Sequence, residues 1–237
     1  MADRWVIPDI HGCVKTLERL IGQIQPKRED HLIFLGDYID RGPDSKGVID
    51  YLMGLQTQGQ KMTLLKGNHE EFVLQAYEIE LGLKKSWLKR EKNPHKEEWF
   101  KHGGKDTMRS FGLKDLRLFP VEYLEWMKKL EYFISLEDYM IVHAGLNFEI
   151  DNPTDDKHTM LWVKEFPIKR HKIGNRKVIH GHTPVSHEFI YDTVNSDKFD
   201  FIDLDNGVYM QNRNGFGQLM ALELNSNTLL AQYNVDQ

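Results

Sequence analysis

Cysteine is almost absent from this sequence. Cys13 is the single cysteine among 237 residues, so the chain can form no internal disulfide bond. No apolar run approaches the ~20 residues that a membrane-spanning helix needs, and the first residues lack the pattern of a secretion signal. We therefore expect a protein of the reducing cytoplasm that does not act at a membrane.

Positive charge is not in excess either. The chain has 31 Lys and Arg against 36 Asp and Glu, a formal net charge of −5 at pH 7, which argues against a general nucleic-acid-binding protein. Basic residues gather in two segments, 84–105 and 164–177. The first is most simply a solvated face, whereas the second could attract an anionic substrate.

What the sequence does contain is an alternation of strand and helix patterns. Apolar spacing predicts helices at 14–24 and 45–58, and residues 71–131 read as a helical insertion resembling a lid or cap. Short apolar runs predict strands at 5–7, 31–35, 62–65, 132–136, 139–142 and 177–179. Three further strands are expected to be antiparallel, at 201–204, 219–224 and 229–233. We expect one α/β domain over residues 1–237, with two packed sheets flanked by helices.

A polar cluster follows each of five expected strands. The clusters are Asp9/His11, Asp37/Asp40/Arg41, Asn68/His69/Glu70, His143 and His180/His182. Any one of them alone could be an ordinary turn with a local ion pair or a buried histidine. The ends of strands, however, are where a sheet brings distant residues together. Five such clusters therefore predict a metal site.

The residue types in these clusters restrict the metal. Carboxylates, imidazoles and an amide oxygen without thiolate suit manganese, iron or zinc better than calcium or an iron–sulfur cluster. There are too many ligands for one ion. Two divalent ions ~3.5–4 Å apart that share a carboxylate are the usual arrangement for hydrolysing phosphate esters.

The same segments resemble the signature motifs of the phosphoprotein phosphatase family of calcineurin-like metallophosphoesterases. The motifs are PDIHG at 8–12, GDYIDRG at 36–42, GNHE at 67–70, HAG at 143–145, GHT at 181–183 and LDNGVY at 204–209. The nearest type is the bacterial and phage serine/threonine phosphatases, and the symmetrical diadenosine tetraphosphatases are related. The resemblance implies two packed mixed β-sheets flanked by helices, and hydrolysis of phosphomonoesters.

The resemblance also implies roles for individual residues. Asp9, His11 and Asp37 would hold one ion, and Asp37, Asn68, His143 and His182 the second, with manganese expected and iron or zinc as alternatives. Arg41 and Asn68 would bind the phosphate. His69, oriented by Asp40, would protonate the leaving oxygen after in-line attack of a hydroxide that bridges the two ions. His180 has no ligand counterpart and is expected to pack behind the site.

Two positions depart from the family pattern. Pro8 stands where glycine is usual, which the end of a strand can accept. Lys164 stands where the family has a second phosphate-binding arginine, so it keeps the charge but loses the bidentate fork. Either Lys164 acts as a point charge, or Arg170 or Arg176 replaces the arginine, or the substrate phosphate is held differently. Lys164 could also be only an exposed loop residue.

Several functions stay open on sequence alone. The leading expectation is hydrolysis of protein phosphoserine and phosphothreonine or of small phosphoesters, with no nucleic-acid partner. Dinucleoside polyphosphates are the alternative, and Trp87 and Trp99 could stack on adenine, although such tryptophans are more often core residues. A non-catalytic binding module is disfavoured by the complete ligand set. A nuclease or phosphodiesterase is disfavoured because GHTP at 181–184 has one histidine after its glycine.

Overall fold

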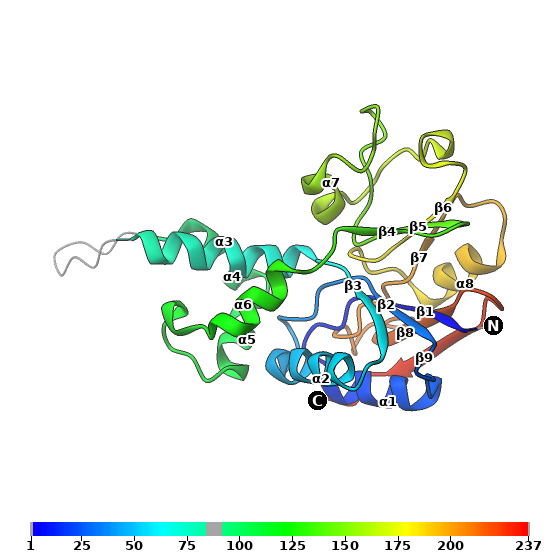
Figure 1. Cartoon of the computed structure of the whole chain (residues 1–237). Coiled ribbons are helices and arrows are strands. Elements are labelled where there is room, and N and C mark those ends of the chain that lie inside the picture. Colours follow the sequence, from blue (N-terminus) through cyan, green and yellow to red (C-terminus); the bar gives the residue numbers. More distant parts are fainter. Residues whose placement is uncertain (1, 84–91, 237) are drawn as a thin grey trace.

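Two β-sheets form the centre of the structure, a computed structural model that describes residues 2–83 and 92–236 (Figure 1). The first sheet has the strand order β3-β2-β1-β8-β9 and the second the order β4-β5-β6-β7. The strands of the first sheet are β1 Arg4–Ile7, β2 His31–Phe34, β3 Lys61–Leu64, β8 Gln218–Glu223 and β9 Leu229–Tyr233. Those of the second are β4 Phe133–Ser135, β5 Tyr139–Val142, β6 Lys177–His180 and β7 Phe201–Asp203.

Both sheets are mixed, as predicted. β1, β2 and β3 run parallel, while β8 is antiparallel to both β1 and β9. β5, β6 and β7 run parallel, and β4 is antiparallel to β5. Parallel strands need long crossover connections, which here are helices.

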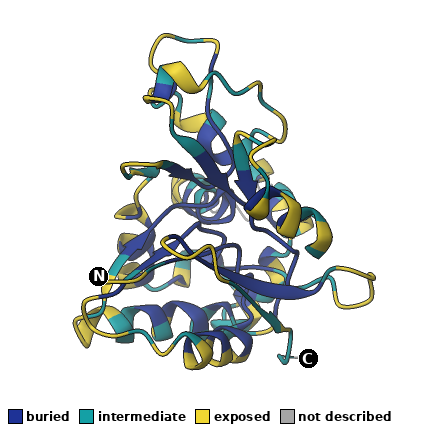
Figure 2. Ribbon diagram, turned by 90° about the vertical axis from the view of Figure 1, so that its right-hand side faces the viewer, coloured by how far each residue is buried: buried dark blue, intermediate teal, exposed yellow. Residues whose placement is uncertain are grey.

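Apolar side chains fill both faces of the first sheet, because successive residues of a strand point to opposite sides. Val6 and Ile33 join one apolar cluster with Ile141 of the second sheet. Ile7 and Phe34 point the other way, into a cluster that contains residues of α1 (Val14–Ile24) and α2 (Ser45–Thr57). Figure 2 shows the strands buried and the exposed positions on the outer sides of helices and loops.

The helical segment between β3 and β4 projects to one side of the sheets (Figure 1). Its helices are α3 Asn68–Gly82, α4 Pro94–Lys101, α5 Gly104–Ser110, the 3₁₀ turn η1 Leu116–Leu118, and α6 Val121–Lys128. Phe72, Trp99 and Met127 of this segment lie in the same buried cluster as Ile7 and Phe34. The projecting helices therefore share their core with the first sheet.

The predicted direction of one strand is wrong. Residues 201–204 were expected to be antiparallel, but β7 pairs in parallel with β6, with Ile179 opposite Ile202. The reason is α8 (His187–Asn195), which the sequence pattern does not predict and which returns the chain so that β7 enters in the direction of β6. Two other short helices were also not expected, α7 Lys157–Trp162 and η2 Arg170–Ile173. Within the described part of the chain, no helix is long and apolar enough to cross a membrane.

Candidate metal centre

The metal-binding candidates meet where the carboxyl ends of β1, β2, β3, β5 and β6 open into loops. Five of the six predicted ligands are buried: Asp9, His11, Asp37, Asn68 and His143. His182 is half-buried at the edge of the group. Buried carboxylates and imidazoles in one place are costly unless they are paired or bind a cation, so this convergence marks a site.

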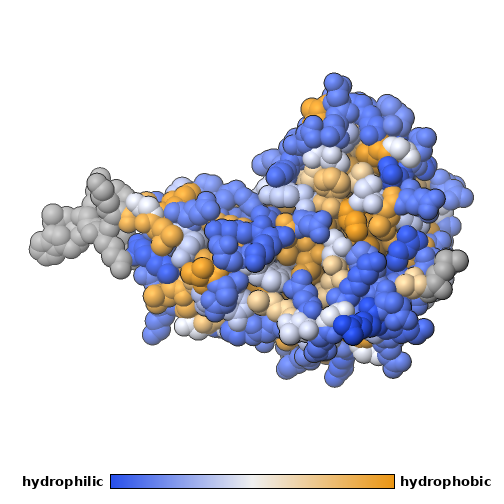
Figure 3. All heavy atoms as spheres, viewed as in Figure 1, coloured by the Kyte–Doolittle hydropathy of each residue, from blue (hydrophilic) through white to orange (hydrophobic). Residues whose placement is uncertain are grey.

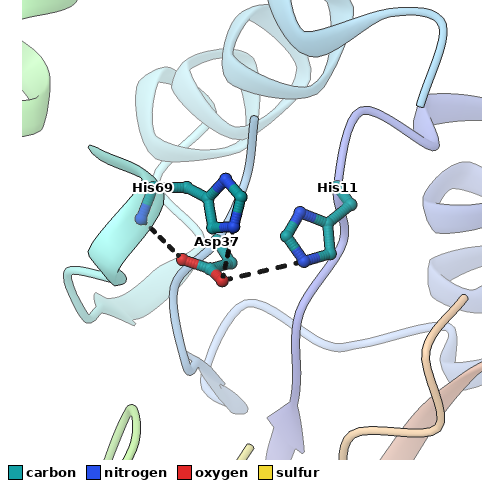
Figure 4. A group of neighbouring side chains, drawn as sticks. All are labelled: His11, Asp37 and His69. Atoms are coloured by element: carbon teal, nitrogen blue, oxygen red, sulfur yellow. Dashed lines mark hydrogen bonds and ion pairs between the residues drawn. The ribbon is translucent and has the colours of Figure 1, made fainter. Parts of the chain in front are cut away.

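One group of possible ligands consists of His11, Asp37 and His69 (Figure 4). Nε2 of His11 lies 3.7 Å and Nε2 of His69 lies 3.8 Å from Oδ2 of Asp37. Figure 4 shows the two imidazole rings side by side, both directed at the same carboxylate oxygen, and the backbone N–H of His69 donates to Oδ1 of Asp37.

A second group consists of Asp37, His143 and His182. Nε2 of His143 lies 3.6 Å from Oδ1 of Asp37. The amide oxygen of Asn68 lies 3.0 Å both from that nitrogen and from Nδ1 of His182. Asp37 thus belongs to both groups, which is the position that a bridging carboxylate would have.

Asp9 approaches from the loop after β1. The backbone N–H of His182 lies 3.3 Å and 3.2 Å from its two carboxylate oxygens. A Cβ atom at position 181 would lie only 2.5 Å from Oδ1 of Asp9, so glycine is required there for this approach. Asp9 and the segment that carries His182 therefore touch at the back of the site.

Backbone carbonyls hold two of the imidazoles. Nδ1 of His11 donates to the carbonyl of Ile39 at 2.9 Å, and Nδ1 of His143 donates to that of Leu35 at 3.0 Å. This leaves the Nε2 lone pair of each ring directed at Asp37, as metal-binding histidines usually require. Burial lowers the pKa of both residues, and it lowers that of His182 to about 3. At neutral pH the three rings are uncharged.

The charge balance of the site calls for cations. Burial, together with the charges of Asp205 and Asp37, raises the pKa of Asp9 well above its ordinary value. Burial also raises the pKa of Asp205 to about 7, and Oδ2 of this residue is a buried oxygen without a hydrogen-bond partner in the described structure. Carboxylates crowded in this way, beside neutral imidazoles, fit divalent ions of the manganese, iron or zinc type.

Several residues of the site have an unusual backbone conformation. Non-glycine residues with positive φ include His11 (46°), Asp37 (51°), Asp40 (72°), Arg41 (67°) and His182 (74°). Such conformations are uncommon outside glycine and cluster at functional sites, where the surrounding structure holds them. Contacts within the site, rather than the intrinsic backbone preferences of these residues, therefore hold the loops in their conformation.

Asp40 lies fully buried behind His69. Its Oδ2 is 2.6 Å from Nδ1 of His69 and accepts a hydrogen bond from Nε1 of Trp99 at 2.8 Å. The hydroxyl of Thr107 donates to Oδ1. Burial by itself would lower the pKa of His69, but the carboxylates of Asp37 and Asp40 raise it. Thr107 was not predicted at the site, and Trp99 was considered only for stacking on adenine; nothing in their local sequence marks a contact with Asp40.

Arg41 lies beside Nε2 of His69, the ring nitrogen that does not contact Asp40. Its Nη2 is 3.3 Å from Nε2 of His69, and its guanidinium lies 4.3 Å from the ring centre of Tyr209. The ring of Tyr209 also meets that of His11 edge-on, at 5.1 Å. The sequence marks Tyr209 only as part of a closing motif, so its place against Arg41 is a structural finding.

A cavity of about 580 Å³ opens onto these residues. Arg41, Asn68 and His182 line it beside the metal candidates, and Phe72 and Trp162 form part of its wall. Figure 3 shows the surface hollowed between the projecting helices and the part of the molecule that carries α7. Both helix groups thus border the space above the site.

Of the three candidates for the second phosphate-binding cation, the structure places one at this cavity. Lys164 is exposed and lines it. Arg170 instead pairs with Asp200, and Arg176 donates to the carbonyl of Leu136. Neither arginine lines the cavity in this structure, and both side chains are engaged elsewhere.

Two further residues of the polar clusters support the site from behind. The carboxylate of Glu70 accepts hydrogen bonds from the backbone N–H groups of Asp37, Tyr38 and Gly67, which fixes the loop after β2. His180 is buried against Phe201, and burial lowers its pKa to about 4.

Comparison with known proteins agrees with these motifs. The family model of the calcineurin-like phosphoesterases matches residues 4–216. Serine/threonine-protein phosphatase 1 of Salmonella typhimurium is 40% identical over 73 residues, 30% of this chain and 32% of that protein. The symmetrical bis(5'-nucleosyl)-tetraphosphatase of Pectobacterium atrosepticum is 28% identical over 155 residues, 63% of this chain and 46% of that one. The matches therefore span less than half of these relatives' own length.

Solved structures share the fold at low sequence identity. A serine/threonine phosphatase from Saccharomyces cerevisiae superimposes with a TM-score of 0.66 and 16% identity, covering 100% of this chain and 81% of that one. A cold-active protein-tyrosine phosphatase from a Shewanella species gives 0.61 and 16%, covering 98% and 80%. With two mixed sheets, the site at their strand ends and the family model matched along most of its length, this chain belongs to the calcineurin-like phosphoesterase family.

Proposed function

We propose that this phosphoesterase removes phosphate from phosphoserine and phosphothreonine in proteins, with His69 as general acid. The observation that carries the proposal is the 2.6 Å contact between Nδ1 of His69 and the buried carboxylate of Asp40. Serine and threonine leave as alkoxides, which are poor leaving groups unless a proton is delivered to them. A histidine anchored through one nitrogen can present the other, protonated, to the leaving oxygen.

The metal ligands in this proposal come from the two groups at Asp37, with Asp9 and Asn68 added and with His69 left free to act as general acid. Asp9, His11 and Asp37 would hold one ion, and Asp37, Asn68, His143 and His182 the other, with manganese as the expected metal. Two such ions would lower the pKa of a bound water and polarise the phosphoryl oxygens. The uncharged state of the three imidazoles supports this assignment, since only a neutral ring can bind a metal.

The remaining groups act on the substrate. Arg41 can donate two parallel hydrogen bonds to the phosphoryl oxygens, and its contact with the ring of Tyr209 holds its guanidinium at the cavity. Asn68 lies beside the same space. Lys164 supplies a point charge at the cavity mouth, which attracts the phosphate but orients it less strictly than an arginine would.

The test compares leaving groups. His69→Asn should lower kcat for a phosphoserine peptide by about 10²–10⁴-fold, but by roughly tenfold or less for p-nitrophenyl phosphate, whose leaving group needs little protonation. His171→Asn, which changes an exposed histidine, is the matched control and should change neither rate. Equal losses on the two substrates would remove His69 from the role of general acid.

A second candidate substrate class is dinucleoside polyphosphates. Of the two tryptophans considered for base stacking, Trp87 lies outside the described residues. Trp99 is fully buried and hydrogen-bonded to Asp40, so it cannot receive a base. Trp162 favours this class instead, because its half-buried ring lines the cavity above the site. A kcat/KM for diadenosine tetraphosphate far above that for a phosphoserine peptide would make it the preferred substrate.

A further inference from the structure

A second cavity, of about 380 Å³, lies beside the cavity of the metal centre. Lys164 and Thr183 line both, so the two spaces are neighbours across these residues. Three aromatic rings contribute to the walls of the second cavity: Phe166, Phe189 and Phe201. We call it the phenylalanine pocket. It lies against β6, β7 and α8, on the side of the second sheet (Figure 1).

The phenylalanine pocket has two polar groups among its lining residues. His180 and Asp203 are paired in register on the parallel strands β6 and β7, so their side chains lie on the same face of the sheet. They are only 6% and 4% exposed, and both line the pocket. The side chains of His180 and Asp203 thus lie together in a pocket whose walls include three aromatic rings.

Each of these side chains has one polar atom left over. Nδ1 of His180 donates to the carbonyl of Gly181 at 3.2 Å, and Oδ1 of Asp203 accepts from the backbone N–H of Asp205 at 3.2 Å. No residue in the described ranges forms a hydrogen bond with Nε2 of His180 or Oδ2 of Asp203. Neither is a fully buried atom without a partner, so both are accessible from the pocket space. An occupant of the pocket would gain by forming hydrogen bonds with both.

These features select the chemistry of the occupant. Phenylalanine rings favour a flat aromatic ring that can stack or meet them edge-on. A purely apolar side chain would fill the space but leave His180 and Asp203 unpaired. A nucleobase such as adenine brings a flat ring, an exocyclic amino group that can donate to Nε2 of His180, and an adjacent ring nitrogen that can pair with the carboxyl of Asp203. The rim carries Lys164 and Glu165, whose charges offset each other.

We propose that the phenylalanine pocket binds the adenine base of a nucleotide substrate, whose phosphate chain passes Thr183 and Lys164 to the metal centre. The proposal rests on the proposed metal-dependent hydrolysis of phosphoesters and adds adenine nucleotides to its substrates. The amino group of the base donates to Nε2 of His180, and the ring nitrogen beside the amino group pairs with the carboxyl of Asp203. Lys164 lies between the two cavities, where it can contact a phosphate that links them.

The first experiment measures binding of nucleosides to the manganese-loaded protein by calorimetric titration. Adenosine should bind, and inosine, which has an oxygen in place of the amino group, should bind at least tenfold more weakly. Phe189→Leu keeps an apolar wall but removes one ring, and should weaken adenosine binding roughly tenfold. Absence of adenosine binding, or equal affinity for inosine, would overturn the proposal.

The second experiment measures turnover. Ile168→Trp places a large ring at a half-buried residue that lines the pocket. It should lower the ratio of kcat/KM for diadenosine tetraphosphate to that for p-nitrophenyl phosphate at least tenfold. Val121→Trp, at a residue of α6 that is 58% exposed, is the matched control and should leave the ratio unchanged.

The possible outcomes distinguish a failure of the pocket proposal from a failure of the proposed function. If the wild-type protein with manganese hydrolyses no phosphoester, the proposed function fails, and the adenosine titration still decides the pocket. If p-nitrophenyl phosphate is hydrolysed but adenosine does not bind, the pocket proposal alone fails. An Ile168→Trp loss confined to phosphopeptides with a neighbouring aromatic residue would assign the pocket to peptides and overturn the adenine assignment.

Discussion

Three side chains converge on the buried carboxylate of Asp40, and they come from two different helices of the projecting segment and from the first turn of α3. His69, Trp99 and Thr107 each form a hydrogen bond with it. The hydroxyl of Thr107 also accepts from the backbone N–H of Asp40, so it fixes both ends of this residue. The orientation of the His69 ring therefore depends on residues far from it in sequence.

Removing the hydroxyl of Thr107 tests whether the orientation of His69 depends on the hydrogen bonds of Asp40. Thr107→Val keeps the shape of the side chain but leaves Asp40 without one donor and one acceptor. We expect the free energy of unfolding to fall by about 1–3 kcal/mol, and kcat for a phosphoserine peptide to fall with it. Urea unfolding and steady-state kinetics measure the two effects. Thr107→Ser retains the hydroxyl and should resemble the wild type; an equally unstable serine variant would contradict the argument.

Lys164 permits a test of charge against geometry. Lys164→Met should raise KM for a phosphoserine peptide about fivefold, because an exposed charge-assisted contact is lost. Lys164→Arg supplies a bidentate fork and should lower KM below that of the wild type. Lys169→Met removes a lysine that pairs with Glu149 and serves as control. If Lys169→Met raised KM as much as Lys164→Met, the effect would be non-specific electrostatic attraction of the substrate rather than a contact of Lys164.

At the scale of elements, the strongest predictions came from local patterns. The spacing of apolar residues predicted a helix at 14–24, and α1 spans the same residues. The clusters after five strands were recognisable because glycine and metal-binding residues stand beside each apolar run. His143 and His182 follow the neighbouring parallel strands β5 and β6 of the second sheet, so their proximity follows from the order of strands. Asp37 follows β2 of the first sheet, and its place beside them depends on how the two sheets pack.

What could not be predicted depends on contacts between distant segments. The direction of β7 follows from α8, whose weak pattern hid the crossover. Trp99 and Thr107 reach Asp40 from helices 59 and 67 residues further along the chain. The phenylalanine pocket likewise forms between α8, β7 and the loop after α7, so no single stretch of sequence encodes it.

The start of α2 offers a test at this scale. Asp44 accepts a hydrogen bond from the backbone N–H of Gly47 at 2.8 Å and caps the helix that follows Arg41. Asp44→Ala should lower the free energy of unfolding by about 1 kcal/mol. Asp44→Asn keeps an oxygen acceptor and should lose much less. Chemical denaturation of the two variants measures the difference, and equal losses would mean that the cap is not the cause.

For the molecule as a whole, the site concentrates negative charge in its interior. Asp205 has a pKa of about 7 against an ordinary value of 3.8, so the folded protein keeps a proton there that the unfolded chain releases at lower pH. At Asp205 the folded state then binds more protons than the unfolded state between about pH 4 and 7, so the contribution of this residue to stability falls as pH rises. The buried histidines of the site, whose pKa values are lowered, contribute in the opposite direction.

A comparison of two chelator-treated proteins isolates the contribution of Asp205. Asp205→Asn removes this carboxyl, so the stability of the wild type relative to that of the variant should fall between pH 5 and pH 7 in urea unfolding. Manganese should stabilise the wild type, because binding to the folded state alone is stabilising. A relative stability that rose over this interval would contradict a raised pKa at Asp205.

The carbonyls of Ile39 and Leu35, which hold the rings of His11 and His143, have a consequence for how the protein is loaded. Because backbone groups fix these rings, an arriving ion needs to order few rotamers, and little of its affinity is lost to entropy. Ions should enter and leave without repacking the interior. The centre can then be emptied and refilled with a different metal in a folded protein, and its catalytic rate would report which metal was supplied.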